Sequence, residues 1–194
     1  MSGDGLVPAV TDKENLRRIY RLRRREAQDV SSAIQQAVLA LIESCSPGVV
    51  GLYSPLPGEV DLFSLREQIA APVALPRADG EGVVEYLSCS DTPLVPDGCG
   101  IPAPSQGIPL KPEQISLLLV PALSVDAHGI RLGYGGGYYD RLRADPDWAD
   151  VPAWAVLPST CLSSTPLPRD QWDVPFHGWI TEFGPGLASP VSAS

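Results

Sequence analysis

A glycine-rich segment in the second half of the chain has the clearest chemical potential. Four of the five positions from 133 to 137 are glycine, and they stand between an apolar run, residues 115–120, and a helical pattern over residues 138–144. Glycines let backbone N–H groups turn toward one point, and the N-terminus of the following helix adds unpaired donors and a positive dipole. The segment therefore predicts a backbone cradle for an anion such as phosphate.

Two charged residues beside these glycines extend the same chemistry. Arg131 can pair with two phosphate oxygens at once, and Asp140 can offer a carboxylate to a magnesium ion. The segment has no Lys-Ser/Thr after its glycines and no G-x-G-x-x-G spacing, so it is neither a Walker A loop nor a dinucleotide fingerprint. A tight turn followed by an aspartate that compensates the helix dipole stays open as the alternative.

A basic helix is predicted near the N-terminus. Thr11-Asp12-Lys13-Glu14 has the form of a capping box, so we expect a helix that begins there and runs to about Gln28. Basic residues then recur one helical turn apart, at Lys13, Arg17, Arg21 and Arg24 or Arg25. The face they form can meet phosphates or a carboxylate-bearing ligand, although a solvated helix face is the commoner role of a charge run.

The charge and composition exclude several classes of protein. The formal net charge is −9, although residues 13–25 hold seven of the fourteen basic residues, so the rest of the chain is strongly acidic. We therefore expect no nucleic-acid partner, and a nucleic-acid module built on the first helix is a distant third hypothesis. The four cysteines are scattered, which indicates free thiols, and no apolar run is long enough for a bilayer, which indicates no membrane partner. We expect a cytoplasmic monomer.

Alternating apolar patterns predict an α/β fold. Strand-like runs fall at residues 49–53, 72–75, 83–87, 115–120, 153–157 and 179–181. Helical patterns fall at residues 31–44 and 138–144, and a further helix opens at Asp61 and carries Leu62, Leu65 and Ile69. We predict one domain of three-layer α/β/α architecture with a largely parallel central sheet.

The remaining segments lack these patterns. Residues 88–114 are rich in Pro, Gly, Asp and Ser, and we predict a long functional loop or lid there. Residues 1–10 are expected to be a flexible N-terminus, residues 11–184 the folded domain, and residues 185–194 a disordered tail of mostly small residues.

The string from Arg131 to Arg141, RLGYGGGYYDR, resembles the signature of 5-formyltetrahydrofolate cyclo-ligases, also called methenyltetrahydrofolate synthetases. The resemblance runs from about Lys13 to Glu182. Further pieces occur in the family's order: Lys13 with Arg17, Gly58-Glu59-Val60-Asp61, Leu75-Pro76-Arg77, Val84-Glu85-Tyr86, Gly100-Ile101-Pro102 and Val120-Pro121.

The resemblance implies an ATP- and Mg²⁺-dependent reaction on a reduced folate. The family converts 5-formyltetrahydrofolate to 5,10-methenyltetrahydrofolate: the γ-phosphoryl group goes to the formyl oxygen, N10 attacks, and phosphate leaves. By resemblance the nucleotide-binding residues are Lys13, Arg17, Arg131, Leu132, Gly133, Tyr134, Gly135, Gly136, Gly137 and Tyr138. Asp140 is implied as the magnesium ligand, Tyr53, Glu59 and Arg77 as substrate-binding residues, and Arg131 and Tyr139 as catalytic residues.

Several of these residues also have a purely structural interpretation. Glu59 can solvate a loop, Arg77 can pair with a surface acid, and the Tyr139 ring can pack in the core. The last segment also departs from the family, because Trp172 and His177 stand where the family has a histidine and an aspartate, and imidazole is a poor magnesium ligand. The alternative function is therefore a non-catalytic paralogue, or one of altered specificity, that binds a nucleotide, a folate or both.

Overall fold

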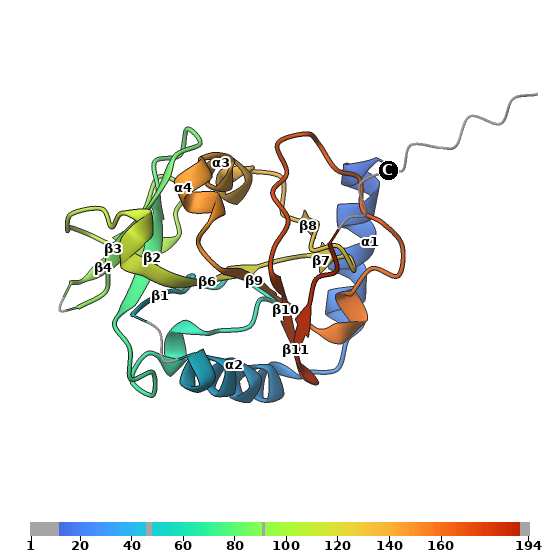
Figure 1. Cartoon of the computed structure of the whole chain (residues 1–194), viewed down its shortest axis with the longest axis horizontal. Helices are drawn as coiled ribbons and strands as arrows, with labels where there is room; N and C mark the ends of the chain where they lie inside the picture. Colours follow the sequence, from blue (N-terminus) through green and yellow to red (C-terminus); the bar gives the residue numbers. More distant parts are fainter. Residues whose placement is uncertain (1–11, 46–47, 91, 191–194) are drawn as a thin grey trace, which may run out of the picture.

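The computed structural model of the chain describes residues 12–45, 48–90 and 92–190. It confirms the α/β class, with a seven-stranded, largely parallel sheet flanked by helices on both faces (Figure 1). The helices are α1 (Lys13–Glu26), α2 (Ser31–Cys45), α3 (Tyr138–Ala144) and α4 (Pro146–Ala149). The strands are β1 (Val49–Gly51), β2 (Val73–Ala78), β3 (Val84–Ser88), β4 (Leu94–Pro96), β5 (Pro102–Pro104), β6 (Ile115–Pro121), β7 (Ser124–Val125), β8 (Arg131–Leu132), β9 (Ala153–Val156), β10 (Gly178–Thr181) and β11 (Gly184–Leu187).

The sheet has the order β11-β10-β9-β6-β1-β2-β3. The five strands from β10 to β2 pair in parallel, while β3 and β11 add antiparallel edges. From β1 the chain continues to β2 on one side, whereas from β6 it continues to β9 on the other. The loops that leave β1 and β6 therefore diverge, and such a switch point is where open α/β sheets bind ligands.

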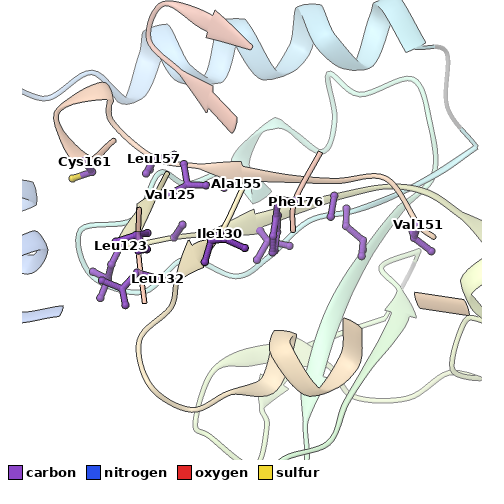
Figure 2. Packing of buried hydrophobic residues seen from close by; sticks show 14 of the residues in the cluster. Leu123, Val125, Ile130, Leu132, Val151, Ala155, Leu157, Cys161 and Phe176 are labelled. Atoms are coloured by element: carbon purple, nitrogen blue, oxygen red, sulfur yellow. The ribbon is translucent and has the colours of Figure 1, made fainter. Parts of the chain in front are cut away.

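Two apolar clusters hold the layers together. On one face of the sheet, α2 buries Ile34, Val38 and Ile42, as its apolar spacing predicts, and complete burial of one such side chain contributes about 1.5–3 kcal/mol. On the other face, Tyr20 of α1 packs with the segment that contains β7 and β8. Figure 2 shows part of this second cluster, in which Phe176 joins side chains of the sheet and of residues 123–132.

The first helix begins slightly later than the capping box predicts. Asp12 is the N-cap of α1, and its side chain accepts a hydrogen bond from the Glu14 N–H at 3.1 Å. Thr11 lies outside the described residues, as does the segment 1–10 that we expect to be flexible. None of the helices in the described part of the chain is long and apolar enough to cross a bilayer.

The prediction of a helix that begins at Asp61 is wrong. Only one turn of 3-10 helix forms, at Phe63–Leu65, and Asp61 Oδ1 accepts from the Ser64 N–H at 3.1 Å. The apolar spacing that suggests a helix is real, since Leu62 and Leu65 are buried, but Pro72 disfavours helical conformation at Ala71 and so limits the length of any helix here. Successive turns bury the same side chains without a regular helix.

Two segments expected to be irregular contain strands. Within residues 88–114, β4 and β5 form a hairpin, and Asp97 ties its turn to β2 by accepting from the backbone N–H groups of Cys99, Ile101 and Ala78. Residues 184–187 form β11, so the predicted disorder of 185–194 is wrong for residues 185–187. Gly186 lies against the indole of Trp179, and a β-carbon at this position would lie only 2.4 Å from Trp179 Nε1. Glycine therefore permits this contact. Residues 191–194 lie outside the described residues.

Candidate active site

A cavity of about 370 Å³ opens beside the divergent loops of β1 and β6. Its walls come from distant parts of the sequence, and the residues used below are Lys13, Arg17, Tyr53, Glu59, Arg131, Gly133–Tyr138, Tyr139, Asp140, Asp170, Trp172 and Asp173. All of the predicted site residues except Leu132 and Arg77 line this one cavity.

The glycine loop adopts backbone conformations that need glycine. Gly135 and Gly137 have φ angles of 113° and 68°, in the region that side chains disfavour. A β-carbon at Gly137 would also lie 2.8 Å from Nη1 of Arg141. Arg141 ties this loop, residues 133–138, to the segment before β3. Its Nη2 donates to the Gly136 carbonyl at 2.6 Å, and its Nε donates to the Gly82 carbonyl at 2.8 Å.

Helix α1 docks its basic face on this loop. Arg17 Nε donates to the Gly133 carbonyl at 3.0 Å, and Arg21 Nη2 donates to the Tyr134 carbonyl at 3.3 Å. The alternative of a merely solvated face is therefore wrong for these residues. The helix brings cationic side chains to the rim of the cavity.

Lys13 lies at the same rim and faces two aspartates. Its Nζ lies 2.6 Å from Asp170 Oδ2 and 3.1 Å from Asp173 Oδ2. Burial lowers the pKa of the Lys13 ammonium, but the hydrogen bonds and negative charges of the two aspartates outweigh burial, so the pKa lies above its ordinary value. Lys13 is therefore protonated and available as a cation at neutral pH.

Arg131 and Asp140 form an ion pair in the wall of the cavity. Arg131 Nη2 lies 2.8 Å from Asp140 Oδ1, and Arg131 Nη1 donates to the Pro121 carbonyl at 3.3 Å. The Arg131 side chain is only 5% exposed, and its guanidinium stacks at 5.3 Å from the Tyr139 ring. The Asp140 side chain is 36% exposed, so it keeps access to the cavity. Within the described residues no group of three His, Cys, Asp or Glu side chains is arranged to hold a metal on its own.

Glu59 carries a carboxylate oxygen with no partner. Its Oε2 accepts from the Leu56 N–H at 2.8 Å, whereas its buried Oε1 has no hydrogen-bond partner. Burial raises the pKa of this carboxyl, while the Leu56 N–H, the Tyr134 hydroxyl and the charges of Arg24 and Arg131 offset part of that rise. A buried acceptor without a donor is uncommon in folded proteins and points to a ligand that supplies one.

Two tyrosines beside Glu59 shape the apolar part of the cavity. Tyr53 is 2% exposed and donates its hydroxyl to the Val60 carbonyl at 2.8 Å. Burial raises the pKa of Tyr139 to about 12, with the Glu59 charge as a further cause. Both phenols are therefore neutral at physiological pH.

Arg77 and Leu132 are not brought to the cavity. Arg77 Nη2 pairs with Glu85 at 3.3 Å on the surface, which is its structural interpretation. Its neighbours Pro76 and Ala78 line the cavity instead, because successive side chains of a strand point to opposite faces. Leu132 is buried in the apolar cluster around β7 and β8.

The acidic turn at residues 170–173 adds one residue, Asp170, that sequence reasoning missed. Asp170 lines the cavity although no motif contains it, and Trp172 is 55% exposed in the same wall. His177 does not line the cavity: its Nδ1 accepts from the Ala153 N–H at 3.2 Å, and burial lowers its pKa. Of the two departures, only Trp172 therefore touches the site.

The fold and this cavity define a class of protein. A parallel α/β sheet with a glycine loop and cationic side chains at its switch point is typical of proteins that bind a phosphate-bearing ligand. A family model described as the 5-formyltetrahydrofolate cyclo-ligase family matches residues 11–182. The chain belongs to this family.

Individual relatives agree with this membership. The 5-formyltetrahydrofolate cyclo-ligase of Haemophilus influenzae is 28% identical over 161 residues, which cover 77% of this chain and 84% of that protein. The NMR structure of a 5,10-methenyltetrahydrofolate synthetase from Aquifex aeolicus superimposes with a TM-score of 0.77 at 28% identity, covering 94% of this chain and 95% of that one. A Mycoplasma pneumoniae 5,10-methenyltetrahydrofolate synthetase shares the fold, with a TM-score of 0.69, 20% identity and coverage of 88% and 99%.

Proposed function

We propose that the protein converts 5-formyltetrahydrofolate to 5,10-methenyltetrahydrofolate with ATP and Mg²⁺. The proposal rests on membership of the cyclo-ligase family and on one structural observation. A single cavity joins a glycine loop with cationic side chains to Glu59, whose Oε1 is buried without a partner. Such a cavity can hold a polyphosphate and a pterin at the same time.

The glycine-loop end is proposed to bind the nucleotide. Lys13 and Arg17 neutralise the triphosphate, and the backbone of residues 133–138 cradles it. The proposal is supported by the fact that all of these residues line the cavity. Asp140 supplies a carboxylate to magnesium. The donor set fits this ion, because Mg²⁺ takes one or two carboxylates together with phosphate oxygens and water rather than a full protein cage.

The Glu59 end is proposed to bind the reduced folate. Glu59 Oε1 accepts a hydrogen bond from the pterin, which would satisfy the orphaned oxygen. Tyr53 and Tyr139 offer neutral, apolar ring surface beside it.

Positioning and charge stabilisation are the proposed contributions of the protein to catalysis. ATP supplies the phosphoryl group that turns the formyl oxygen into a leaving group, after which N10 closes the ring and phosphate departs. Arg131 lies between Asp140 and the Tyr139 ring in the wall of the cavity, where its positive charge can stabilise a transferring phosphoryl group. Holding both reactants in one cavity removes the entropy cost of their encounter.

We also propose that the protein acts as a monomer in the cytoplasm. All four cysteines are free thiols, as their spacing predicts, and this agrees with a reducing compartment.

The test is an absorbance assay for the methenyl product with 5-formyltetrahydrofolate, ATP and Mg²⁺. Asp140→Asn keeps the shape of the side chain and an acceptor for Arg131 but loses the charge that attracts magnesium. It should lower kcat/KM by roughly a hundredfold or more. Asp150→Asn, which removes an exposed aspartate at the end of α4, is the matched control and should behave as wild type. Folded wild-type protein that binds both ligands without forming product would favour the non-catalytic alternative.

A further inference from the structure

Two neighbouring glycines of the loop line the cavity through their backbone alone. Gly136 and Gly137 have no side chains, and both of their carbonyls are already occupied. The Gly136 carbonyl accepts from Arg141 Nη2 at 2.6 Å, and the Gly137 carbonyl accepts from the Arg141 N–H at 2.9 Å. No group in the described part of the chain accepts from the N–H of either glycine. These N–H groups are therefore what the two residues can offer to a ligand.

The peptide that joins Gly136 to Gly137 needs a restraint from outside. A peptide between two glycines can rotate as a unit at little steric cost, because neither residue has a β-carbon. This peptide is trans, so its carbonyl and its N–H point in opposite directions. A rotation would exchange the Gly137 N–H for the Gly136 carbonyl. It would then present an acceptor where a phosphate needs a donor.

Arg141 supplies such a restraint without lining the cavity itself. One nitrogen of its guanidinium, Nη2, holds the Gly136 carbonyl, while Nε donates to the Gly82 carbonyl at 2.8 Å. The guanidinium is planar and keeps these two nitrogens at a fixed separation, so the two carbonyls together fix its position. It also lies 5.3 Å from the centre of the Tyr138 ring. Three contacts thus hold one side chain against the start of α3.

The Gly82 carbonyl is a firm anchor, because it belongs to a closely bonded turn between β2 and β3. Asp79 Oδ1 accepts from the three N–H groups of residues 81–83, at distances of 2.7 to 2.9 Å. The Asp79 N–H in turn donates to the Val83 carbonyl at 3.1 Å and closes the turn. Arg141 therefore fixes the glycine loop against a second segment that its own backbone bonds hold in place.

Two ordinary roles of a surface arginine do not account for this placement. No carboxylate of the described residues forms an ion pair with the Arg141 guanidinium. A cation beside the first turn of a helix opposes the helix dipole, so the contact with Gly136 does not stabilise α3 by its charge. What the side chain does provide is two directed hydrogen bonds to carbonyls.

We propose that Arg141 is a positioning residue, which holds the Gly136–Gly137 peptide with its N–H free for the phosphates of the ligand. The inference rests on the proposed function, in which the glycine loop binds the nucleotide. It names the side chain that sets the direction of the donors in that loop. Arg141 does not touch the ligand and acts through the backbone.

The test is a calorimetric titration of wild type and variants with inorganic tripolyphosphate and Mg²⁺. Arg141→Met should weaken binding roughly tenfold, the size expected for one hydrogen bond to a charged group. Arg141→Lys keeps the charge but has one nitrogen where the guanidinium uses two, so it should remain about threefold or more weaker than wild type. Arg66→Met is the matched control and should bind as wild type. Arg66 also contacts a carbonyl and an aromatic ring, both of Phe63, but lies outside the cavity wall.

Steady-state kinetics separate positioning from a general structural role. Arg141→Met should raise the KM for ATP by a factor similar to its loss of tripolyphosphate affinity. It should leave the KM for 5-formyltetrahydrofolate close to that of wild type, because the peptide belongs to the nucleotide end of the cavity. A variant that merely loosened the fold would change both KM values together.

Three outcomes would overturn the inference while leaving the proposed function intact. Unchanged tripolyphosphate affinity in folded Arg141→Met would show that the peptide needs no restraint. Full recovery in Arg141→Lys would show that the residue acts through its charge alone. An equal rise of both KM values would assign Arg141 to the stability of the fold.

A second variant covers the case in which Arg141→Met does not fold. In Gly82→Ala the new β-carbon would lie 2.9 Å from Arg141 Nε and displace the guanidinium from its anchor. Unchanged tripolyphosphate affinity in that variant would reject the positioning role. A wild type that binds tripolyphosphate but shows no turnover would overturn the proposed function, whereas the titrations would still decide the role of Arg141.

Discussion

The Lys13 ammonium lies 2.6 Å from the Asp170 carboxylate, across the rim of the cavity. Asp173 completes the arrangement at 3.1 Å and is held in turn by accepting from the Asp170 N–H at 2.8 Å. The cation at the proposed nucleotide end is thus shared with an acidic turn. A polyphosphate that binds there competes with Asp170 for Lys13.

Removal of one competing carboxylate should favour the nucleotide. Asp170→Asn is expected to lower the KM for ATP a few-fold, because it frees Lys13 and removes a negative charge from the rim. The Asp170 side chain is 46% exposed, so the effect should shrink as salt screens it. Steady-state kinetics at low and high ionic strength measure both features. A KM for ATP that rises in Asp170→Asn would show that Asp170 supports binding.

The conformation of the glycine loop can be tested at Gly137. Gly137→Ala places a side chain at a φ of 68° and against Arg141, so we expect a loss of about 1 kcal/mol or more of unfolding free energy and weaker ATP binding. Gly184→Ala is the comparison variant, because its φ of 102° also disfavours a side chain, while open space surrounds the new β-carbon. Urea unfolding and calorimetric ATP titration measure the pair. Equal ATP affinities in the two variants would count against the cradle.

Trp172 is expected to stack on the base of the nucleotide. Its indole is 55% exposed in the cavity wall, between the two aspartates that hold Lys13. Loss of one base-aromatic stack costs roughly 1–3 kcal/mol, so Trp172→Ala should weaken ATP binding at least about fivefold. Inorganic tripolyphosphate has no base, and its affinity should be unchanged. A change in folate affinity alone would instead assign the indole to the substrate.

Glu59 should make the stability of the protein depend on pH. Burial raises its native pKa above the ordinary 4.5, so the folded protein binds this proton more tightly than the unfolded chain. Stability from this group is therefore present at low pH and is lost as pH rises from 4.5 through the raised native value. Glu59→Gln should abolish that slope and be more stable than wild type at neutral pH, with folate turnover lost. Urea unfolding at several pH values across this interval measures the free energy of unfolding of both proteins. The same pH dependence of that free energy in wild type and Glu59→Gln would contradict a raised pKa for Glu59.

Local patterns determined much of the fold. The apolar spacing of residues 31–44 requires a helix with one buried stripe, and the apolar run at 115–120 requires a strand covered on both faces. Long-range contacts override such patterns in short segments. β11 forms because its backbone pairs with the edge strand β10. After Asp61, turns form although the apolar spacing of that segment would also allow a helix.

For the site, the sequence by itself determined the place and the backbone conformation of the glycine loop, because the signature from Arg131 to Arg141 is contiguous and its glycines have a local conformational reason. Tertiary structure alone decided which scattered side chains join that loop. Asp170 meets Lys13 across 157 positions, and Arg24 rather than Arg25 turns inward to Tyr134. A linear pattern records spacing along the chain, whereas the packing of α1 on the switch point of the sheet brings these residues together in space.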